Sequence, residues 1–227
     1  MMKGREGAVF EALARLPKAG LVLIGGYAVN AYVPPRFSID CDVVVLGSTK
    51  EVETALRKDG FREGESGDTP YGRYMRYEKR EEGVSFDLMV NSVLDRDTNI
   101  VFEASLFEEY SAERTTTGGS VALRTTMRIA DPELLFVMKF VAGRRQDVRD
   151  IFMLASTPLN WALAERLALT KCSRDLLKER AEMIRGSISS REYRDSLQGP
   201  YGKFPDDRFE MCRSGLLSFL NRLTDGG

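Results

Sequence analysis

VLIGGYAVNAYVPPRFSIDCDVVVL, residues 22–46, is the stretch of sequence that decides the fold. Its apolar start, 22–24, stops at the paired glycines 25–26, as a buried strand bounded by glycine does. Helix-compatible residues follow until the prolines at 34–35 forbid further helix. A second apolar run at 39–46 has the character of another buried strand. The stretch therefore predicts a strand, a glycine turn, a short helix, a loop and a second strand.

The glycine turn is a candidate phosphate site. Gly25 and Gly26 carry no side chain, so the backbone between strand and helix can approach a ligand closely. The start of the following helix offers free N–H groups and the positive end of a dipole, both of which favour an anion. Such turns also occur with no ligand, so the glycines alone do not decide the function.

Two carboxylates in the second strand are the strongest sign of chemistry. Side chains alternate across a strand, so Asp40 and Asp42 share one face, with α-carbons roughly 7 Å apart, while Cys41 takes the other face. Carboxylates in an apolar strand are costly unless something neutralises them. A pair of Mg²⁺ ions would do so, because hard cations prefer oxygen ligands. In the alternative, one aspartate lies at the exposed start of the strand and the other pairs with Arg36.

A third carboxylate lies in another apolar strand, 84–90, where Asp87 is the only charge. An isolated carboxylate in such a run needs a reason. It would take the proton from an attacking hydroxyl, or position that hydroxyl, and share a metal with the first two aspartates. In the alternative, Asp87 pairs with Arg73 or Arg76 across the sheet.

These motifs resemble the signature of the nucleotidyltransferase superfamily, which includes DNA polymerase beta, the CCA-adding enzymes and antibiotic nucleotidyltransferases. The signature is a hydrophobic residue, Gly-Gly or Gly-Ser, a spacer and Asp-x-Asp; here thirteen residues (27–39) separate Gly26 from Asp40. The approach to the strand, Arg-Phe-Ser-Ile-Asp at 36–40, is also similar. The resemblance implies a nucleoside triphosphate as substrate and two Mg²⁺ ions. It assigns metal binding and catalysis to Asp40, Asp42 and Asp87, and triphosphate contact to Gly25, Gly26, Arg36 and Ser38.

A lysine in an apolar helix is the next candidate. Asp-Pro-Glu at 131–133 is a good helix start. Residues 134–143 continue the helix and are apolar nearly all round, with Lys139 their only charge. A buried lysine must reach a partner or extend its ammonium to the surface. It either holds a triphosphate or forms a salt bridge to Asp147 or Asp150.

The order of these elements resembles one branch of the superfamily. Asp-Pro-Glu, a lysine in an apolar helix and then Arg-x-x-Asp-x-x-Asp-Ile is similar to abortive-infection-type toxin nucleotidyltransferases and the related minimal nucleotidyltransferases. The resemblance implies that Lys139 binds nucleotide phosphate and that Asp147 supports Lys139 or the site. Gln146 stands where those relatives often have a lysine.

Composition narrows the class of protein. The chain has 227 residues, 43% hydrophobic and 30% charged, with a formal net charge of −1, which is typical of a globular protein. It contains no histidine, so His-based triads, His acid–base catalysis and His-ligated zinc are excluded. The three cysteines lie far apart and match neither a zinc site nor a disulfide framework. No run is long and apolar enough for a membrane span or a signal core. We therefore expect no membrane partner and a cytoplasmic location.

The pattern of elements predicts an α+β fold. Residues 1–130 are expected to form the nucleotidyltransferase catalytic domain, a mixed β-sheet with flanking helices. Residues 131–227 are expected to form a helical C-terminal domain that completes the cleft. We expect a polar loop at 64–72, and C-terminal helices at 159–170, 173–186, 189–197 and 206–223. Between Lys171 and Arg194, seven basic residues face four acidic ones; this excess would meet an RNA backbone or form a solvated, ion-paired helix face.

The function expected from residues and resemblance together is Mg²⁺-dependent transfer of a nucleoside monophosphate, from ATP or another nucleoside triphosphate, to an acceptor hydroxyl. Pyrophosphate leaves. The acceptor stays open among tRNA or another RNA, a protein hydroxyl and an antibiotic hydroxyl, and the toxin-like resemblance favours RNA. That resemblance also implies a cognate antitoxin as partner. A different class of function is a non-catalytic, partner-binding member of the fold, against which the three carboxylates argue.

Overall fold

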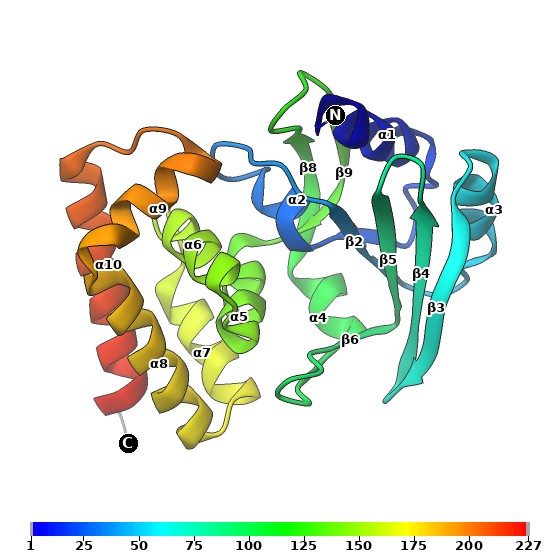
Figure 1. Cartoon of the computed structure of the whole chain (residues 1–227). Helices are drawn as coiled ribbons and strands as arrows, with labels where there is room; N and C mark the ends of the chain where they lie inside the picture. The colour runs from blue at the N-terminus through cyan, green and yellow to red at the C-terminus, as the bar shows by residue number, and fades with distance from the viewer. Residues whose placement is uncertain (1, 226–227) are drawn as a thin grey trace. The chain divides into compact units, whose positions relative to one another are not determined.

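The computed structural model describes residues 2–225, and the chain divides into two compact units (Figure 1). The first unit comprises residues 1–94 and 101–131; the second comprises 95–100 and 132–227. The helices and strands of the first unit are α1 (Met2–Arg15), β1 (Leu21–Leu23), α2 (Gly25–Val29), β2 (Asp40–Val45), α3 (Lys50–Lys58), β3 (Arg62–Thr69), β4 (Gly72–Lys79), β5 (Val84–Val90), β6 (Ser92–Leu94), β7 (Val101–Glu103), α4 (Ala104–Glu109), β8 (Ser111–Thr117) and β9 (Arg124–Ala130). Those of the second are α5 (Pro132–Ala142), α6 (Arg145–Leu154), α7 (Trp161–Lys171), α8 (Arg174–Ser189), α9 (Arg191–Tyr201) and α10 (Asp206–Asp225).

The first unit is built on a seven-stranded mixed sheet in the order β3-β4-β5-β2-β1-β9-β8. β2 runs parallel to β5 and antiparallel to β1, and β1 runs parallel to β9. Figure 1 shows β2, β5, β4 and β3 side by side in this order. The predicted α+β class, a mixed sheet with flanking helices followed by C-terminal helices, is confirmed.

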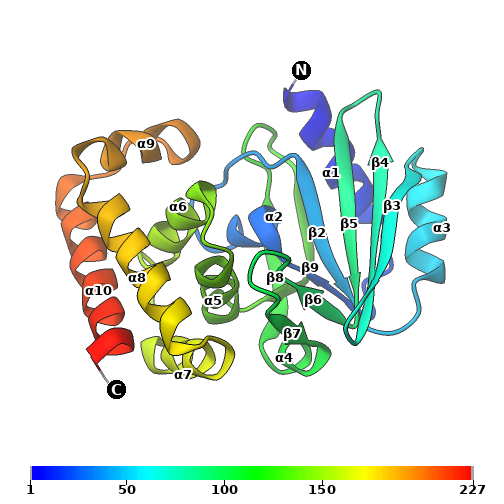
Figure 2. The ribbon, with the colours of Figure 1, turned by 60° about the horizontal axis from the view of Figure 1, so that its bottom comes forward.

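The two faces of the central strands differ in chemistry. On one face, Cys41 and Val43 of β2 and Phe86 and Leu88 of β5 are fully buried. Alternation along the strands turns the carboxylates of β2 and β5 to the opposite face. α1 packs against β5, β9 and α3, and α2 lies beside β2 (Figure 2). The buried face thus forms the core, and the other face is available for chemistry.

The predicted loop at 64–72 is wrong over most of its length, because β3 spans Arg62–Thr69. β3 is the edge strand of the sheet and pairs antiparallel with β4. Its side chains are exposed on both faces, so no apolar alternation marks it, and only backbone hydrogen bonding to β4 defines it. Two helix boundaries also differ: α2 includes both glycines of the expected turn, and α9 continues through Pro200 to Tyr201.

A buried glutamate in α1, unmarked by any motif, secures the loop between β8 and β9. The Glu6 carboxylate is fully buried. It accepts hydrogen bonds from the backbone N–H of Gly119 at 2.8 Å and of Val121 at 3.0 Å, and from the Ser120 hydroxyl at 2.6 Å. Polar groups of three consecutive loop residues are therefore satisfied by one side chain that lies 113 residues or more away in the sequence.

Glu6→Gln should lower the free energy of unfolding by about 1–3 kcal/mol, because the amide turns an N–H donor toward backbone donors and leaves buried groups unsatisfied. Urea denaturation measures this loss. Glu11→Gln on the exposed side of the same helix is the matched control and should change the free energy by no more than about 1 kcal/mol. An equal loss in both variants would show that Glu6 does not secure the loop.

The second unit has an aromatic core. Phe136 of α5 packs edge-to-face on Trp161 of α7 at 5.6 Å and on Phe219 of α10 at 5.2 Å between ring centroids. A second cluster joins Phe152 of α6 to Tyr193 of α9 at 5.4 Å. Edge-to-face pairs add to the stabilisation from apolar burial. No helix among residues 2–225 is long and apolar enough to cross a membrane.

Candidate active site

Three aspartates meet on the open face of two neighbouring strands. Asp40 and Asp42 lie two residues apart on β2, and Asp87 of β5 is the direct partner of Asp42 in the parallel register. Asp40 stands at the first position of β2, with 43% of its side chain exposed, whereas 14% of the Asp87 side chain is exposed. The structure thus brings together the three carboxylates that the sequence predicted as a site.

Gly25 lies directly against the Asp42 carboxylate. Its backbone has φ +67, in the left-handed region that favours glycine. A Cβ added there would lie 1.9 Å from Asp42 Oδ2, a distance at which no carbon fits. Only glycine at position 25 therefore allows the main chain at the start of α2 to lie this close to the Asp42 carboxylate.

Gly26 lies against two more of the predicted residues. A Cβ at Gly26 would be 2.8 Å from Ser38 Oγ and 3.1 Å from Arg36 Nη2. Asn30 fixes this loop, because its Nδ2 donates to the Arg36 carbonyl at 2.8 Å and its Oδ1 accepts from the Arg36 N–H at 3.1 Å. A hydroxyl and a guanidinium thus converge on the glycine backbone, a set of donors that suits phosphate oxygens.

Arg76 of β4 bridges the carboxylates of β2 and β5. Its Nη2 lies 2.8 Å from Asp40 Oδ1, and its Nη1 lies 3.5 Å from Asp87 Oδ2. Nη2 also donates to Ser85 Oγ at 2.9 Å. Burial acts to lower the pKa of Arg76, but Asp87 and Asp40 raise it above its ordinary value on balance. The ion pair considered between Asp87 and Arg76 is formed, and Asp40, which lies at the exposed start of β2, also pairs with Arg76.

Burial and the charge of the site carboxylates raise the pKa of two neighbouring side chains, Tyr74 and Cys41. Burial first, and then Asp87, raises the pKa of Tyr74, whose hydroxyl donates to Asp87 Oδ1 at 3.2 Å. On the other face of β2, complete burial and the charges of Asp42, Asp87 and Asp40 raise the pKa of the Cys41 thiol well above its usual range. Cys41 is therefore a core thiol, and we assign it no chemistry.

The donor set fits Mg²⁺ in its chemistry. Carboxylate oxygens from adjacent strands are the ligands that hard divalent cations prefer. As the side chains stand, no three Asp, Glu or Cys residues within 2–225 are placed to hold an ion. Arg76 supplies positive charge between Asp40 and Asp87 instead. Arg76 and a metal ion would therefore compete for the charge of Asp40 and Asp87.

Arg76→Gln should increase the stabilisation that Mg²⁺ gives, because the variant removes the positive charge that lies between Asp40 and Asp87. In EDTA the variant should melt at a lower temperature than the wild type, and Mg²⁺ should raise its melting temperature by more. Differential scanning calorimetry with and without Mg²⁺ measures both effects. Arg62→Gln on the exposed edge strand is the control, and equal Mg²⁺ shifts in all three proteins would show that Arg76 and the metal do not compete.

Lys139 and Asp147 lie together in the second unit. Lys139 Nζ of α5 is 2.7 Å from Asp147 Oδ1 and 3.1 Å from Asp150 Oδ2, both on α6. The lysine side chain is 15% exposed and Asp150 is fully buried. Asp147 Oδ2 also accepts from the Arg144 N–H at 3.2 Å and so caps α6. The ion pairs considered for Lys139 are both formed, and they hold its ammonium in a fixed position.

A comparison with family models identifies the chain. The model of the nucleotidyl transferase AbiEii toxin family, of type IV toxin–antitoxin systems, matches residues 10–222. The chain belongs to this family. The resemblance to abortive-infection-type toxin nucleotidyltransferases is therefore confirmed, and nucleotidyl transfer is the general activity that the AbiEii family name states.

Two other comparisons add no argument. Among solved structures, the STING-associated CdnE c-di-GMP synthase from Capnocytophaga granulosa matches with 10% identity, over 99% of this chain and 79% of that chain, at a TM-score of 0.25. A TM-score this low does not support a structural inference. No curated protein matches the chain.

Three residues that contact the site carboxylates, Tyr74, Arg76 and Ser85, have no site role in the predictions from the sequence. Arg76 was considered only as a structural ion-pair partner, and Tyr74 and Ser85 were not considered. Ser85 Oγ donates to Asp40 Oδ1 at 2.5 Å. Tyr74 and Arg76 lie two residues apart on one strand and so share a face. That face can be assigned to the carboxylates only when the register of β4 on β5 is known.

Proposed function

We propose that the protein transfers a nucleoside monophosphate from a nucleoside triphosphate to an acceptor hydroxyl and releases pyrophosphate. The position of Asp42 carries this proposal: it pairs with Asp87 across β2 and β5, and Gly25 lies against its carboxylate. This arrangement puts oxygen donors for a metal beside a bare backbone suited to phosphate. Membership of the nucleotidyl transferase AbiEii family supports the same chemistry.

The proposed roles divide between the metal ligands and the phosphate ligands. Asp40, Asp42 and Asp87 would hold two Mg²⁺ ions, which supply Lewis-acid stabilisation of charge at the transferred phosphate. The backbone of Gly25 and Gly26 binds the triphosphate. The same contact is proposed for the side chains of Arg36 and Ser38, which lie beside Gly26.

Asp87 is the proposed general base. Its carboxylate takes the proton of the acceptor hydroxyl, or orients that hydroxyl for attack. Tyr74 donates a hydrogen bond to Asp87 Oδ1 at 3.2 Å and so fixes the carboxylate. Lys139 is proposed to bind nucleotide phosphate, while Asp147, 2.7 Å away, orients its ammonium. Positive charge from Lys139 and Arg36 would stabilise the departing pyrophosphate.

For the acceptor we propose RNA, with tRNA first. The support is the toxin description of the family, since transfer to a shared RNA would harm the cell.

A cognate antitoxin is the proposed protein partner, because the family is assigned to type IV toxin–antitoxin systems. Cytoplasm is the proposed location, since both partners would be found there. Domain roles are proposed in the same way: residues 1–130 carry the metal ligands, and 131–227 supply Lys139.

The test is to incubate the purified protein with Mg²⁺, each α-phosphate-labelled nucleoside triphosphate in turn, and a cell extract containing RNA and protein. Products are separated on a denaturing gel, and Asp40→Ala/Asp42→Ala is the control. Label in small RNA that the control lacks is the expected result, and the nucleotide that gives it names the base. Label in a protein band would replace RNA by a protein acceptor. Label in neither would move the proposal to a small molecule, such as an antibiotic, or to a non-catalytic partner-binding role.

A further inference from the structure

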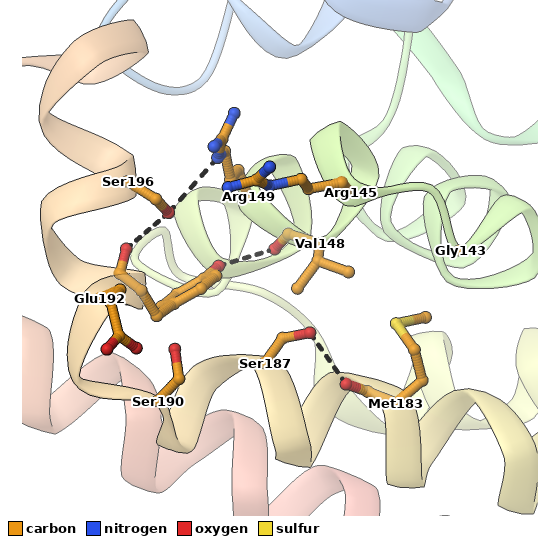
Figure 3. Close-up of a pocket in the computed structure, with 10 residues that line it drawn as sticks. Gly143, Arg145, Val148, Arg149, Met183, Ser187, Ser190, Glu192 and Ser196 are labelled. Carbon is orange, nitrogen blue, oxygen red and sulfur yellow. Dashed lines mark hydrogen bonds between the residues drawn. The ribbon is translucent and has the colours of Figure 1, made fainter.

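The second unit contains a pocket of about 380 Å³, lined by residues of α6, α8 and α9 and by Gly143 and Ser190 (Figure 3). All of its lining residues lie between 143 and 196. None of them belongs to the glycine–aspartate site or to the Lys139 ion pairs. The volume is within the range of pockets that hold small ligands, roughly 300–1,000 Å³.

Two arginines on one wall, Arg145 and Arg149, form no ion pair with any carboxylate of the described residues. Arg145 and Arg149 are one helical turn apart on α6, a spacing at which like charges repel. Figure 3 shows both side chains projecting from α6 on the side of α9. Among the described side chains, neither has a carboxylate within ion-pair distance; Arg149 contacts only neutral oxygens, Ser196 Oγ at 3.4 Å and Gln146 Oε1 at 3.3 Å. An uncompensated arginine pair beside a pocket is suited to a bound anion.

Other basic residues of the same unit show the contrast. Arg180 lies beside the carboxylate of Glu179 at 2.5 Å, Arg213 beside Glu210 at 2.7 Å, and Arg222 beside Glu165 at 3.0 Å. Ion pairing is thus common on the surface of these helices. The charge of Arg145 and Arg149 stands out because it faces a pocket and has no such partner.

The rest of the lining indicates more than a bare phosphate site. Val148 of α6, which is buried, and Met183 of α8 supply apolar lining, and Ser187 and Ser190 line the pocket as well, with the Ser187 hydroxyl donating to the Met183 carbonyl at 2.9 Å. Ser190 begins α9 without a side-chain cap hydrogen bond, so its hydroxyl is available. Glu192 also lines the pocket, and Figure 3 shows its carboxylate directed away from both guanidinium groups. It can accept hydrogen bonds from hydroxyl or amino groups of a ligand.

We propose that this pocket binds a nucleotide through its phosphate. Arg145 and Arg149 are the phosphate ligands, since guanidinium groups bind phosphate oxygens in a bidentate manner. Val148 and Met183 contact the base or ribose, and Glu192 accepts from its hydroxyl or amino groups. The site is separate in its residues from the proposed triphosphate site, so the inference does not rest on the proposed transfer reaction. A free mononucleotide and a nucleotide within RNA share this chemistry, and the test distinguishes them.

The test is isothermal titration calorimetry of the full chain in EDTA with AMP, adenosine, inorganic phosphate and a short oligouridylate. EDTA removes any metal-dependent nucleotide binding by the aspartates. AMP should bind more tightly than adenosine or phosphate. Arg145→Gln/Arg149→Gln should weaken AMP binding at least about tenfold, because charge-assisted hydrogen bonds are lost. Asp40→Ala/Asp42→Ala should bind AMP as the wild type does, which keeps this result independent of the transfer reaction.

The matched control is Arg174→Gln/Lys178→Gln, which removes two exposed charges at the same helical spacing on α8, outside the pocket. It should change affinity by less than about twofold, because exposed charges at a distance are screened. Ser187→Leu reduces the pocket volume without changing charge and should also weaken AMP binding, with its fold checked by thermal melting. Equal loss in both double variants, adenosine binding as tight as AMP, or binding of neither AMP nor oligouridylate by the wild type would overturn the proposal. Oligouridylate binding that depends on Arg145 and Arg149 without AMP binding would replace the mononucleotide by RNA.

Discussion

Asp42→Asn is expected to reduce nucleotidyl transfer by more than about 100-fold and to leave the fold intact. Changes in residues that only orient a metal ligand typically cost about 10–100-fold, and Asp42 is proposed as a ligand itself. The amide has nearly the same size as the carboxylate but carries no charge, so it binds Mg²⁺ weakly. Loss of one negative charge among three also relieves repulsion, and we expect the free energy of unfolding to stay the same or to rise.

The measurement is a rate of label transfer at saturating nucleoside triphosphate, together with urea denaturation of the same preparations. Asp68→Asn is the matched control, because Asp68 lies exposed on the edge strand β3 and the same change there should affect neither quantity. Transfer by Asp42→Asn at the wild-type rate would contradict the proposed site. Loss of activity together with loss of folded protein would instead make Asp42 a structural residue.

The sequence predicted the parts of the site that depend on local pattern. Alternation within one strand was enough to put Asp40 and Asp42 on one face, and an apolar run made Asp87 conspicuous. In the same way, the apolar surroundings of Lys139 required a partner, and the two aspartates considered are both within 3.1 Å. In each case the physical cost of an isolated charge in an apolar element led to the interpretation.

The sequence could not predict contacts that depend on register or on distant segments. For Asp87 the sequence offered both Arg73 and Arg76 as partners, and only the register of β4 on β5, which places Arg76 opposite Asp87, decides between them. Glu6 contacts a loop more than one hundred positions later, and nothing in its helix marks it. β3 escaped prediction because an exposed edge strand shows no apolar alternation.

Gly25→Ala is expected to have the second large effect, on activity more than on stability. The left-handed backbone at φ +67 costs an alanine roughly 1–2 kcal/mol. In addition, the new methyl group would lie 1.9 Å from Asp42 Oδ2 and 2.7 Å from Asp42 Cγ, so either the carboxylate or the glycine backbone must move. A displacement of about 1 Å in a catalytic group can cost about 100-fold in rate.

Gly47→Ala separates the effect of backbone strain from the effect of the clash with Asp42. Gly47 also has a positive φ, +104, but a Cβ there meets no atom within 4 Å. It should therefore lose stability from backbone strain and keep its transfer rate, whereas Gly25→Ala should lose both. The comparison uses urea denaturation and the transfer rate of the folded fraction. If the two variants lose activity equally, general strain explains the loss; if Gly25→Ala alone loses it, the requirement for glycine at position 25 comes from the Asp42 carboxylate beside it.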